Sequence, residues 1–503
     1  MSYQPPSRRR AAYAILVGGY LNIGVVAVLG LLLVPLYLKY IGPYLYGAWL
    51  GSGDILGWLA VIDMGLASLM IQRMGAAYGR SDRQLISQYL ATGLATQVVL
   101  VTLLFVGAVV ISRWIPGWMG VKGNDATILA GCIVLAAASS SLNILNNGIA
   151  GFAMALQRTV FMSAAALTGS LVGIGVTISL LLMDWGLWAI PLGWVVREVT
   201  TLVGNTIYAS FVYRSEVSVP LRLSRKVLRD FGTVSPPMFL SKLGDAFMGH
   251  SEVALIAIFI KPELATVYVL TRRAADIIRM VLDRFGAATF ASFSNLIGTG
   301  QKARAAGIYK EIMDLFVPVA VLSISMYLAA NQTFMSLWVG NDLYGGNLLS
   351  TLIGLSILVA AGSNLINYLY GATGQIARGS LILFVEALVR LGLMVVLLWW
   401  LRLPGLPLAI ILTGTVASSI TLRWTRQELG EAPGLRMVSM KMIAYGCLLA
   451  LGALLGTRIW AETWLGFVLL CLLLGITFFG VATYTSPPLR AYSVGIIWRI
   501  KKK

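Results

Sequence analysis

The sequence predicts an all-α, polytopic membrane protein with about 14 transmembrane helices. Of its 503 residues, 58% are hydrophobic and 12% are charged, whereas about 45–50% and about 25% are usual in soluble chains. Apolar runs that reach the about 20 residues of a helical crossing recur along nearly the whole chain. This composition excludes a soluble enzyme, a nucleic-acid-binding protein and a secreted disulfide-linked domain. The three cysteines lie in apolar runs, so they predict no disulfide framework.

The predicted crossings follow the apolar runs in chain order. They cover 11–38, 44–72, 85–112, 126–153, 159–183, 186–211, 231–260, 264–292, 307–330, 347–372, 379–401, 404–424, 440–457 and 463–484. Strand-like alternation of polar and apolar residues is absent from them. In the seventh segment, Ser235-Pro236-Pro237 predicts a break or a kink, because two backbone donors are missing there.

The distribution of basic residues predicts that both termini lie in the cytoplasm. With this orientation, 25 Lys and Arg side chains fall in cytoplasmic segments and six in external ones. Cytoplasmic loops of membrane proteins carry such an excess. The net charge of +18 is therefore mainly a signal of orientation and does not indicate a nucleic-acid partner.

An internal repeat predicts how the crossings are grouped. Shifting the chain by 220 residues aligns 118–158 with 338–378, with 9 identities in 41 positions. The same shift maps the first six crossings onto the next six, which makes the repeat parallel. We therefore expect an N-terminal six-helix lobe over 1–220 and a C-terminal one over 221–430. Residues 431–503 hold two extra helices and a basic cytoplasmic tail.

Charges at membrane depth point to a binding site. Each charge at the centre of a lipid-facing helix costs about 2.5–3.5 kcal/mol, so the six charges of 264–292 cannot all face lipid. Among them, Arg272, Asp276, Arg279 and Asp283 form one helical stripe and can pair one turn apart. We expect a cationic cavity for an anionic amphiphile, because guanidinium groups hold phosphate oxygens well. The predicted ligands of the anion are Arg272, Arg273, Arg279, Arg284 and Lys242. The alternative is that these charges are interhelical ion pairs that stabilise the fold.

A second set of groups could couple transport to an ion. It comprises Asp63, Asp245, His250, Glu252, Asp276 and Asp283, which could equally be structural. His250 is the only histidine, so a metal site is not expected, and no cofactor is predicted. A buried, neutral His250 that bonds to a neighbouring helix is the alternative to a titrating one. The chain also has no P-loop and no Ser/His/Asp constellation, so we expect no enzymatic activity.

Two regions resemble a known family. The first reads LLLVPLYLKYIGPYLYGAWL (31–50) and LAVIDMGLASLMIQRMG (59–75), and the second reads YLYGATGQIARGS (368–380). These segments resemble bacterial polysaccharide and O-antigen flippases of the Wzx type, which belong to the multidrug/oligosaccharidyl-lipid/polysaccharide (MOP) exporter superfamily. The matching positions are Pro35, Gly42, Tyr46, Gly47, Asp63, Gly65, Gly371, Gly374 and Gln375.

This resemblance implies a function and a location. It implies a flippase in the bacterial inner membrane that moves polyprenyl-diphosphate-linked oligosaccharide to the periplasmic leaflet by alternating access. Membrane lipid and the polysaccharide polymerase and export proteins are the expected partners. The alternative is an ion-coupled multidrug (MATE-like) antiporter of the same fold. Segment 11–38 contains no charge, unlike the first helix of multidrug exporters and of peptidoglycan-precursor flippases, which favours the polysaccharide branch.

Overall fold

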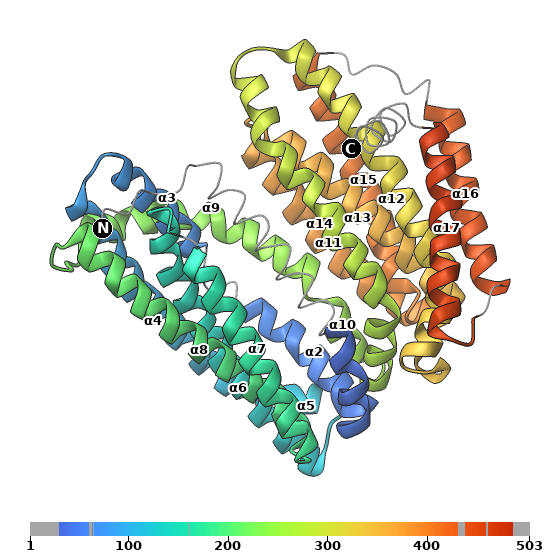
Figure 1. Ribbon diagram of the computed structural model, residues 1–503, viewed down its shortest axis with the longest axis horizontal. Helices are drawn as coiled ribbons and strands as arrows, with labels where there is room; N and C mark the ends of the chain where they lie inside the picture. The colour runs from blue at the N-terminus through green and yellow to red at the C-terminus, as the bar shows by residue number, and fades with distance from the viewer. Residues whose placement is uncertain are drawn as a thin grey trace, which may run out of the picture. The chain divides into compact units, whose positions relative to one another are not determined.

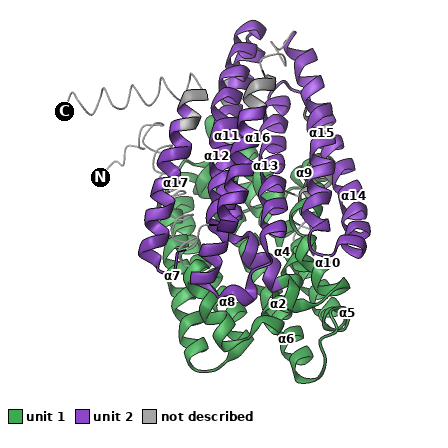
Figure 2. Ribbon diagram, turned by 90° about the vertical axis from the view of Figure 1, so that its right-hand side faces the viewer, with its two compact units in different colours: residues 1–265 green, residues 266–503 purple. Residues whose placement is uncertain are grey.

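The computed structural model describes residues 30–59, 63, 65–158, 160–430, 438–458 and 461–485, and every regular element in these ranges is a helix (Figure 1). Contacts divide the chain into two compact units, unit 1 (residues 1–265) and unit 2 (residues 266–503), which Figure 2 colours separately. Of the first predicted crossing, residues 30–40 are described and are helical.

Besides the helix at 30–40, the described part of unit 1 contains eight long or medium helices, with short 3-10 and π turns between some of them. They are α2 (Pro43–Leu59), α3 (Leu66–Gly79), α4 (Arg83–Ile111), α6 (Gly123–Ala155), α7 (Val160–Leu182), α8 (Ala189–Val212), α9 (Arg225–Gly249) and α10 (Glu252–Phe259), with α5 (Ile115–Trp118), η2 (Gly186–Trp188) and η3 (Tyr213–Val217) as short connections. Side-chain caps fix two of the helix starts. Asp82 accepts from the amide of Leu85 at the start of α4, and Ser224 accepts from that of Val227 at the start of α9.

Unit 2 contains the remaining helices. They are α11 (Pro262–Gly298), most of which lies in this unit, α12 (Lys302–Trp338), α13 (Asn347–Gly371), α14 (Ile376–Leu401), α15 (Gly405–Leu429), α16 (Val438–Arg458) and α17 (Trp464–Thr485), with the turn η4 (Asn341–Leu343). The last two helices pack on α12. Gly452 and Gly456 allow α16 to approach α12 closely, since an added Cβ would lie 2.5 Å from the Ser325 carbonyl oxygen and 2.2 Å from that of Leu328.

The helix order supports the predicted duplication. In unit 1, α4 packs on α6, α6 on α8, and α7 on α8. In unit 2, α12, α13, α14 and α15 occupy the corresponding places in the chain and pair in the same way. The boundary between the units lies at residue 265 rather than at the expected 220, because α9 packs against α2, α3 and α4 and α10 packs against α2.

Two predicted crossings are interrupted. The segment 44–72 is two helices, since α2 ends at Leu59 and α3 begins at Leu66 after Gly65, which has a left-handed φ of 72°. The segment 231–260 is also two helices, but the break is not at Pro236-Pro237. The α9 helix continues through these prolines and ends after Gly249. Proline lies inside membrane helices where neighbouring groups satisfy the freed backbone carbonyls.

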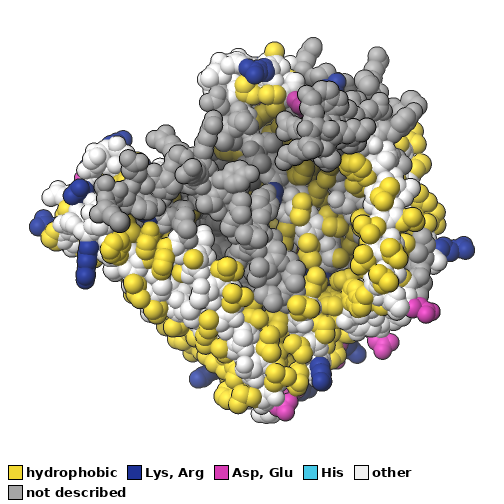
Figure 3. Space-filling model, viewed as in Figure 1, with side chains coloured by type: hydrophobic (Ala, Val, Ile, Leu, Met, Phe, Trp, Pro, Cys, Tyr) yellow, Lys and Arg dark blue, Asp and Glu magenta, His cyan; other side chains and the backbone are white. Residues whose placement is uncertain are grey.

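The surface of the described helices is that of a membrane protein. Seven of them are long and apolar enough to cross a bilayer: α4, α6, α7 and α12 to α15. Three shorter apolar helices lie at 30–40, 443–458 and 464–480. Hydrophobic side chains dominate the described surface that Figure 3 shows, and Trp399 and Trp400 at the end of α14 are 74% and 83% exposed. The protein is therefore a multi-pass membrane protein.

Candidate functional site

The charged stripe predicted for 264–292 lies on the long helix α11. This helix begins with Pro262 and has Glu263 in its first turn, and both residues favour a helix start. Its regular periodicity places Arg272 one turn before Asp276, and Arg279 one turn before Asp283. Both pairs form ion pairs, with Arg272 Nε 3.1 Å from Asp276 Oδ2 and Arg279 Nε 3.6 Å from Asp283 Oδ2. The predicted pairing along the helix is thus present.

These pairs are accessible. The side chains of Arg272 and Asp276 are 22% and 29% exposed, and those of Arg279 and Asp283 are 42% and 31% exposed. A guanidinium group has five N–H donors, and an ion pair with one carboxylate uses only part of them. Asp283 is held from the other side by Asn364 of α13, whose Nδ2 donates to its Oδ1 at 2.8 Å. The stripe is therefore a fixed row of dipolar pairs that is partly exposed.

The other two predicted arginines of α11 carry uncompensated charge. Within the described part of the chain, neither Arg273 nor Arg284 forms an ion pair. Arg273 is partly buried and its Nε has no hydrogen-bond partner there, while Arg284 is exposed. Eleven residues separate them, which is about three helical turns, so both lie on nearly the same face of α11. These two cations are the strongest candidates for binding an anion.

The remaining predicted groups lie in unit 1. Lys242 and Asp245 belong to α9, and their side chains lie outside the described part of the structure. Asp63 is partly buried between α2 and α3, and Glu252 is the buried first residue of α10. No cluster of three or more metal-ligating side chains occurs among the described residues.

His250 is not the buried histidine of the alternative prediction. It occupies the break between α9 and α10, and its side chain is 49% exposed. Its Nδ1 lies 3.8 Å from Oδ1 of Asp54, a residue of α2. The imidazole rests directly on Gly57, one turn further along α2, where an added Cβ would lie 2.6 Å from the ring. The short contact explains why a residue without a side chain occupies this position.

Asp54, one of the charges predicted at membrane depth, is a functional candidate outside the two sets predicted for anion binding and ion coupling. Its Oδ2 accepts hydrogen bonds from the backbone amides of Val253 at 2.9 Å and Ala254 at 3.2 Å, so it caps the first turn of α10 from another helix. A carboxylate favours this place because the helix dipole is positive there. The only signal in the sequence is a single acidic residue within an apolar helix.

The comparisons with known proteins agree with this architecture. The profile of a family described as "Polysaccharide biosynthesis protein" matches residues 58–338. No curated protein matches the chain by sequence.

Several solved membrane proteins have the same fold. A structure of the lipid II flippase MurJ in an inward closed conformation has a TM-score of 0.66 at 11% identity, with 94% of this chain and 97% of that chain covered. An inward-facing MATE multidrug transporter of the MOP superfamily has a TM-score of 0.61 at 16% identity, with coverages of 80% and 94%. A MATE transporter of Vibrio cholerae has a TM-score of 0.53 at 16% identity, with coverages of 84% and 97%.

The predicted resemblance to the MOP superfamily is confirmed by the family match and by these folds. The solved proteins that share this fold include a lipid II flippase and multidrug transporters.

Proposed function

Because the chain belongs to the polysaccharide biosynthesis protein family, we propose that it is a flippase for polyprenyl-diphosphate-linked oligosaccharide. The repeat units move from the cytoplasmic to the periplasmic leaflet of the bacterial inner membrane by alternating access. Membrane lipid surrounds the polyprenyl tail, and polysaccharide polymerase and export proteins take up the product. The likeness to a lipid II flippase and to multidrug transporters supports the fold that this activity requires.

The observation that carries the proposal is that Arg273 and Arg284 of α11 form no ion pair with any described residue. A charge at membrane depth is costly, so an arginine without a counter-ion is retained there when it has a role. A diphosphate cannot enter hydrocarbon unaided, because its hydration would be lost. Arg273 and Arg284 replace this hydration with charge-assisted hydrogen bonds at two depths along one face of the helix.

The paired arginines have a secondary role in this proposal. Arg272 and Arg279 are further proposed ligands of phosphate or sugar oxygens, while Asp276 and Asp283 limit the positive charge. A site of moderate charge releases its cargo more readily than one with four free cations, as transport requires. Lys242 of α9 is a further proposed ligand of the diphosphate.

Ion coupling is assigned to the carboxylates and the histidine of unit 1. Asp54 and His250 meet at the break between α9 and α10, where a change of charge would act on the cap of α10. Asp63, Asp245 and Glu252 are the other candidates for this coupling. Breaks in membrane helices are places where backbone can move, which suits a gate.

Export of glycan in a deletion strain tests the proposal. The wild-type gene should restore surface polysaccharide, and the double variant Arg273→Gln/Arg284→Gln should leave lipid-linked repeat units on the cytoplasmic side. Arg113→Gln, a change at an exposed arginine just beyond α4, is the matched control and should export normally. Immunoblotting of membranes checks that all variants accumulate equally.

The same strains separate the proposal from the antiporter alternative. Unchanged surface glycan in the deletion strain, together with greater sensitivity to cationic drugs, would support an ion-coupled multidrug antiporter. Normal export by the double variant at normal protein level would instead retain the flippase and contradict the assignment of Arg273 and Arg284.

A further inference from the structure

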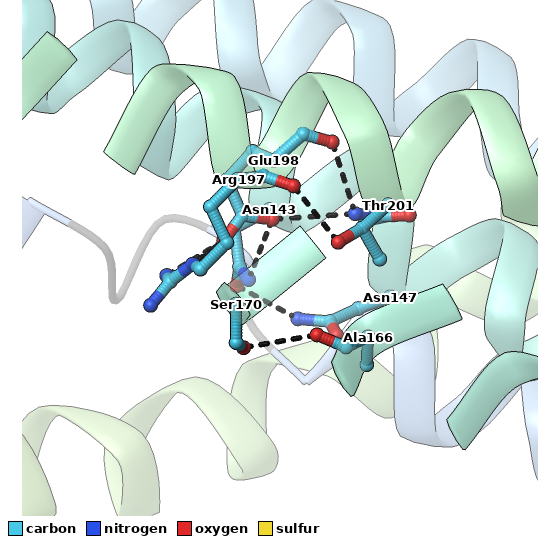
Figure 4. Close-up of polar contacts among 8 residues, drawn as sticks. Asn143, Asn147, Ala166, Ser170, Arg197, Glu198 and Thr201 are labelled. Carbon is cyan, nitrogen blue, oxygen red and sulfur yellow. Dashed lines mark hydrogen bonds and ion pairs between the residues drawn. The ribbon is translucent and has the colours of Figure 1, made fainter. Parts of the chain in front are cut away.

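Unit 1 contains a polar cluster that the charged stripe of α11 does not include. It lies where α6, α7 and α8 meet, and Figure 4 shows Glu198, Arg197, Asn143 and Asn147 from it. The carboxylate of Glu198 is at its centre. Glu198 Oε1 accepts from Arg197 Nε at 2.9 Å and Nη2 at 2.6 Å, and its Oε2 accepts from the amides of Asn143 and Asn146, each at 3.2 Å. Asn205 donates to Asn146 Oδ1 at 2.8 Å. We call these residues the Glu198 cluster.

The packing of α7 on α8 fixes this arrangement. An added Cβ at Gly173 would lie 2.7 Å from Arg197 Cβ, and one at Gly169 would lie 2.1 Å from Thr201 Oγ1. The hydroxyl of Thr201 donates to the backbone carbonyl of Arg197, which lies one turn earlier on α8. Because the helices touch at glycines, the backbone that carries Arg197 and Glu198 has little freedom. The polar groups are therefore pre-organised.

The cluster has a closed and an open side. The Glu198 side chain is 4% exposed, whereas that of Arg197 is 41% exposed. Within the described residues, Nη1 of Arg197 makes no hydrogen bond. Asn147 is also exposed, and its side-chain amide donates to Asn143 Oδ1 at 3.1 Å. The side-chain oxygen of Asn147 accepts no hydrogen bond from the described residues. The open side thus offers a donor and an acceptor.

An aromatic ring lies beside the open side. Trp194 precedes Arg197 by three residues on α8, so the two are neighbours on one helix surface. Its side chain is partly exposed, and its ring packs against that of Trp49 of α2 with centroids 5.3 Å apart. An indole held by another indole is a rigid apolar platform.

The charge balance decides which ligand fits. Arg197 and Glu198 neutralise one another, so the cluster does not select a diphosphate as Arg273 and Arg284 do. A sugar ring has hydroxyl groups that both donate and accept, and it has an apolar C–H face. We propose that the Glu198 cluster and Trp194 bind the neutral sugar rings of the lipid-linked oligosaccharide. Arg197 and Asn147 bond to the hydroxyls, and the indole packs against the ring. This inference rests on the proposed flippase function.

Transport of two related lipids tests the sugar site. The full chain is reconstituted in vesicles with the lipid-linked repeat unit isolated from the same cells, or with this lipid trimmed by glycosidases to its first sugar. Losing one hydrogen bond or one ring contact should lower the transport rate of the intact lipid about fivefold at subsaturating concentration. We therefore expect Arg197→Lys and Trp194→Leu each to transport the intact lipid about fivefold more slowly than the wild type. Both variants should transport the trimmed lipid at the wild-type rate. Trp400→Leu, at a highly exposed tryptophan of α14, is the control and should change neither rate.

A binding measurement separates the sugar site from the flippase proposal. Equilibrium dialysis of the detergent-solubilised full chain with the labelled, released oligosaccharide should show binding that both variants weaken. Equal loss of transport with both lipids, or unchanged oligosaccharide binding in both variants, would overturn the sugar assignment. A wild-type chain that binds the oligosaccharide but moves neither lipid would overturn the flippase function and leave the sugar site standing.

Discussion

Each unit contains an arginine–glutamate pair whose glutamate is buried. The pair lies on the sixth helix of the repeat in unit 1 and on the fifth helix in unit 2. In unit 1 both residues, Arg197 and Glu198, belong to α8. In unit 2 both belong to α14, where Arg390 Nη2 bonds to Oε1 of Glu386 one turn away. The shift of 220 residues pairs Glu386 and Arg390 with Ala166 and Ser170 of α7. In a duplicated fold, the ion pair at corresponding helix interfaces can therefore be carried by either of the two helices.

The two pairs differ in exposure. The Arg390 side chain is 5% exposed and its Nε donates to Thr413 of α15 at 3.2 Å, whereas the Arg197 side chain is 41% exposed. A closed pair fixes two helices against each other, while an open pair keeps donors for a ligand. This difference favours a structural role for the pair of unit 2 and is consistent with the binding role proposed for that of unit 1.

The largest expected effect is on the closed pair. Replacing one partner, Glu386→Leu, leaves the buried Arg390 without a counter-ion and should lower the free energy of unfolding by about 3–5 kcal/mol. Thermal unfolding in detergent, followed by circular dichroism, measures this. Glu198→Leu should cost less, because the freed Arg197 can be solvated.

The double variant Glu386→Leu/Arg390→Leu is the control for this comparison. It should regain most of the lost stability, because two apolar side chains replace a desolvated pair. If Glu198→Leu destabilises the protein as much as Glu386→Leu does, the distinction between an open and a closed pair is wrong.

The glycines beside each pair provide a smaller contrast. In Gly173→Ala the new methyl group meets the carbonyl oxygen of Gly193 at 2.7 Å, and a backbone atom cannot move aside. In Gly414→Ala it meets Cγ1 of Val359 at 2.8 Å, which is a side-chain atom. Overpacking costs about 1–3 kcal/mol, so we expect this loss for Gly173→Ala and a smaller one for Gly414→Ala. Denaturation midpoints of the two variants check the order, and the reverse order would contradict it.

The second crossing of each repeat gives a third contrast, since it is broken in unit 1 and continuous as α11 in unit 2. Asp54→Ala removes the cap that α2 supplies to α10 and should cost about 0.5–2 kcal/mol. Asp276→Ala removes a partly exposed pair within one helix, which is worth about 0.3–0.5 kcal/mol. Hydrogen exchange of the Val253 and Ala254 amides should accelerate only in Asp54→Ala. Equal exchange in both variants would show that the cap does not hold α10.

The smallest expected effect concerns an exposed pair of unit 1. Arg73 Nη2 bonds to Asp230 Oδ1 at 2.9 Å, with side chains that are 39% and 26% exposed. Arg73→Gln should therefore cost only about 0.2–1 kcal/mol, and less at high salt. Unfolding at two salt concentrations measures both values. A cost as large as that of Glu386→Leu would show that exposure does not separate the two classes of pair.

The sequence predicted the class of fold, the duplication and the charged stripe. Hydropathy identifies the long apolar helices α4, α6, α7 and α12 to α15. The fixed geometry of a helix makes Arg272 meet Asp276 and Arg279 meet Asp283. The sequence did not predict where crossings are interrupted. The positions of Gly65 before α3 and of His250 after α9 depend on their neighbours in the fold. It also did not distinguish the paired arginines from Arg273 and Arg284 by their contacts.

What the sequence determined by itself is local or cumulative: apolar length indicates the long membrane helices, and a turn of 3.6 residues sets contacts along one helix. What only the tertiary structure decided is which helix faces meet. Asp54 caps an amide 199 residues away in the chain, and Asn143 and Asn146 reach Glu198 from another helix. Such contacts depend on how ridges of one helix fit the grooves of the next, which the pattern along a single helix does not specify.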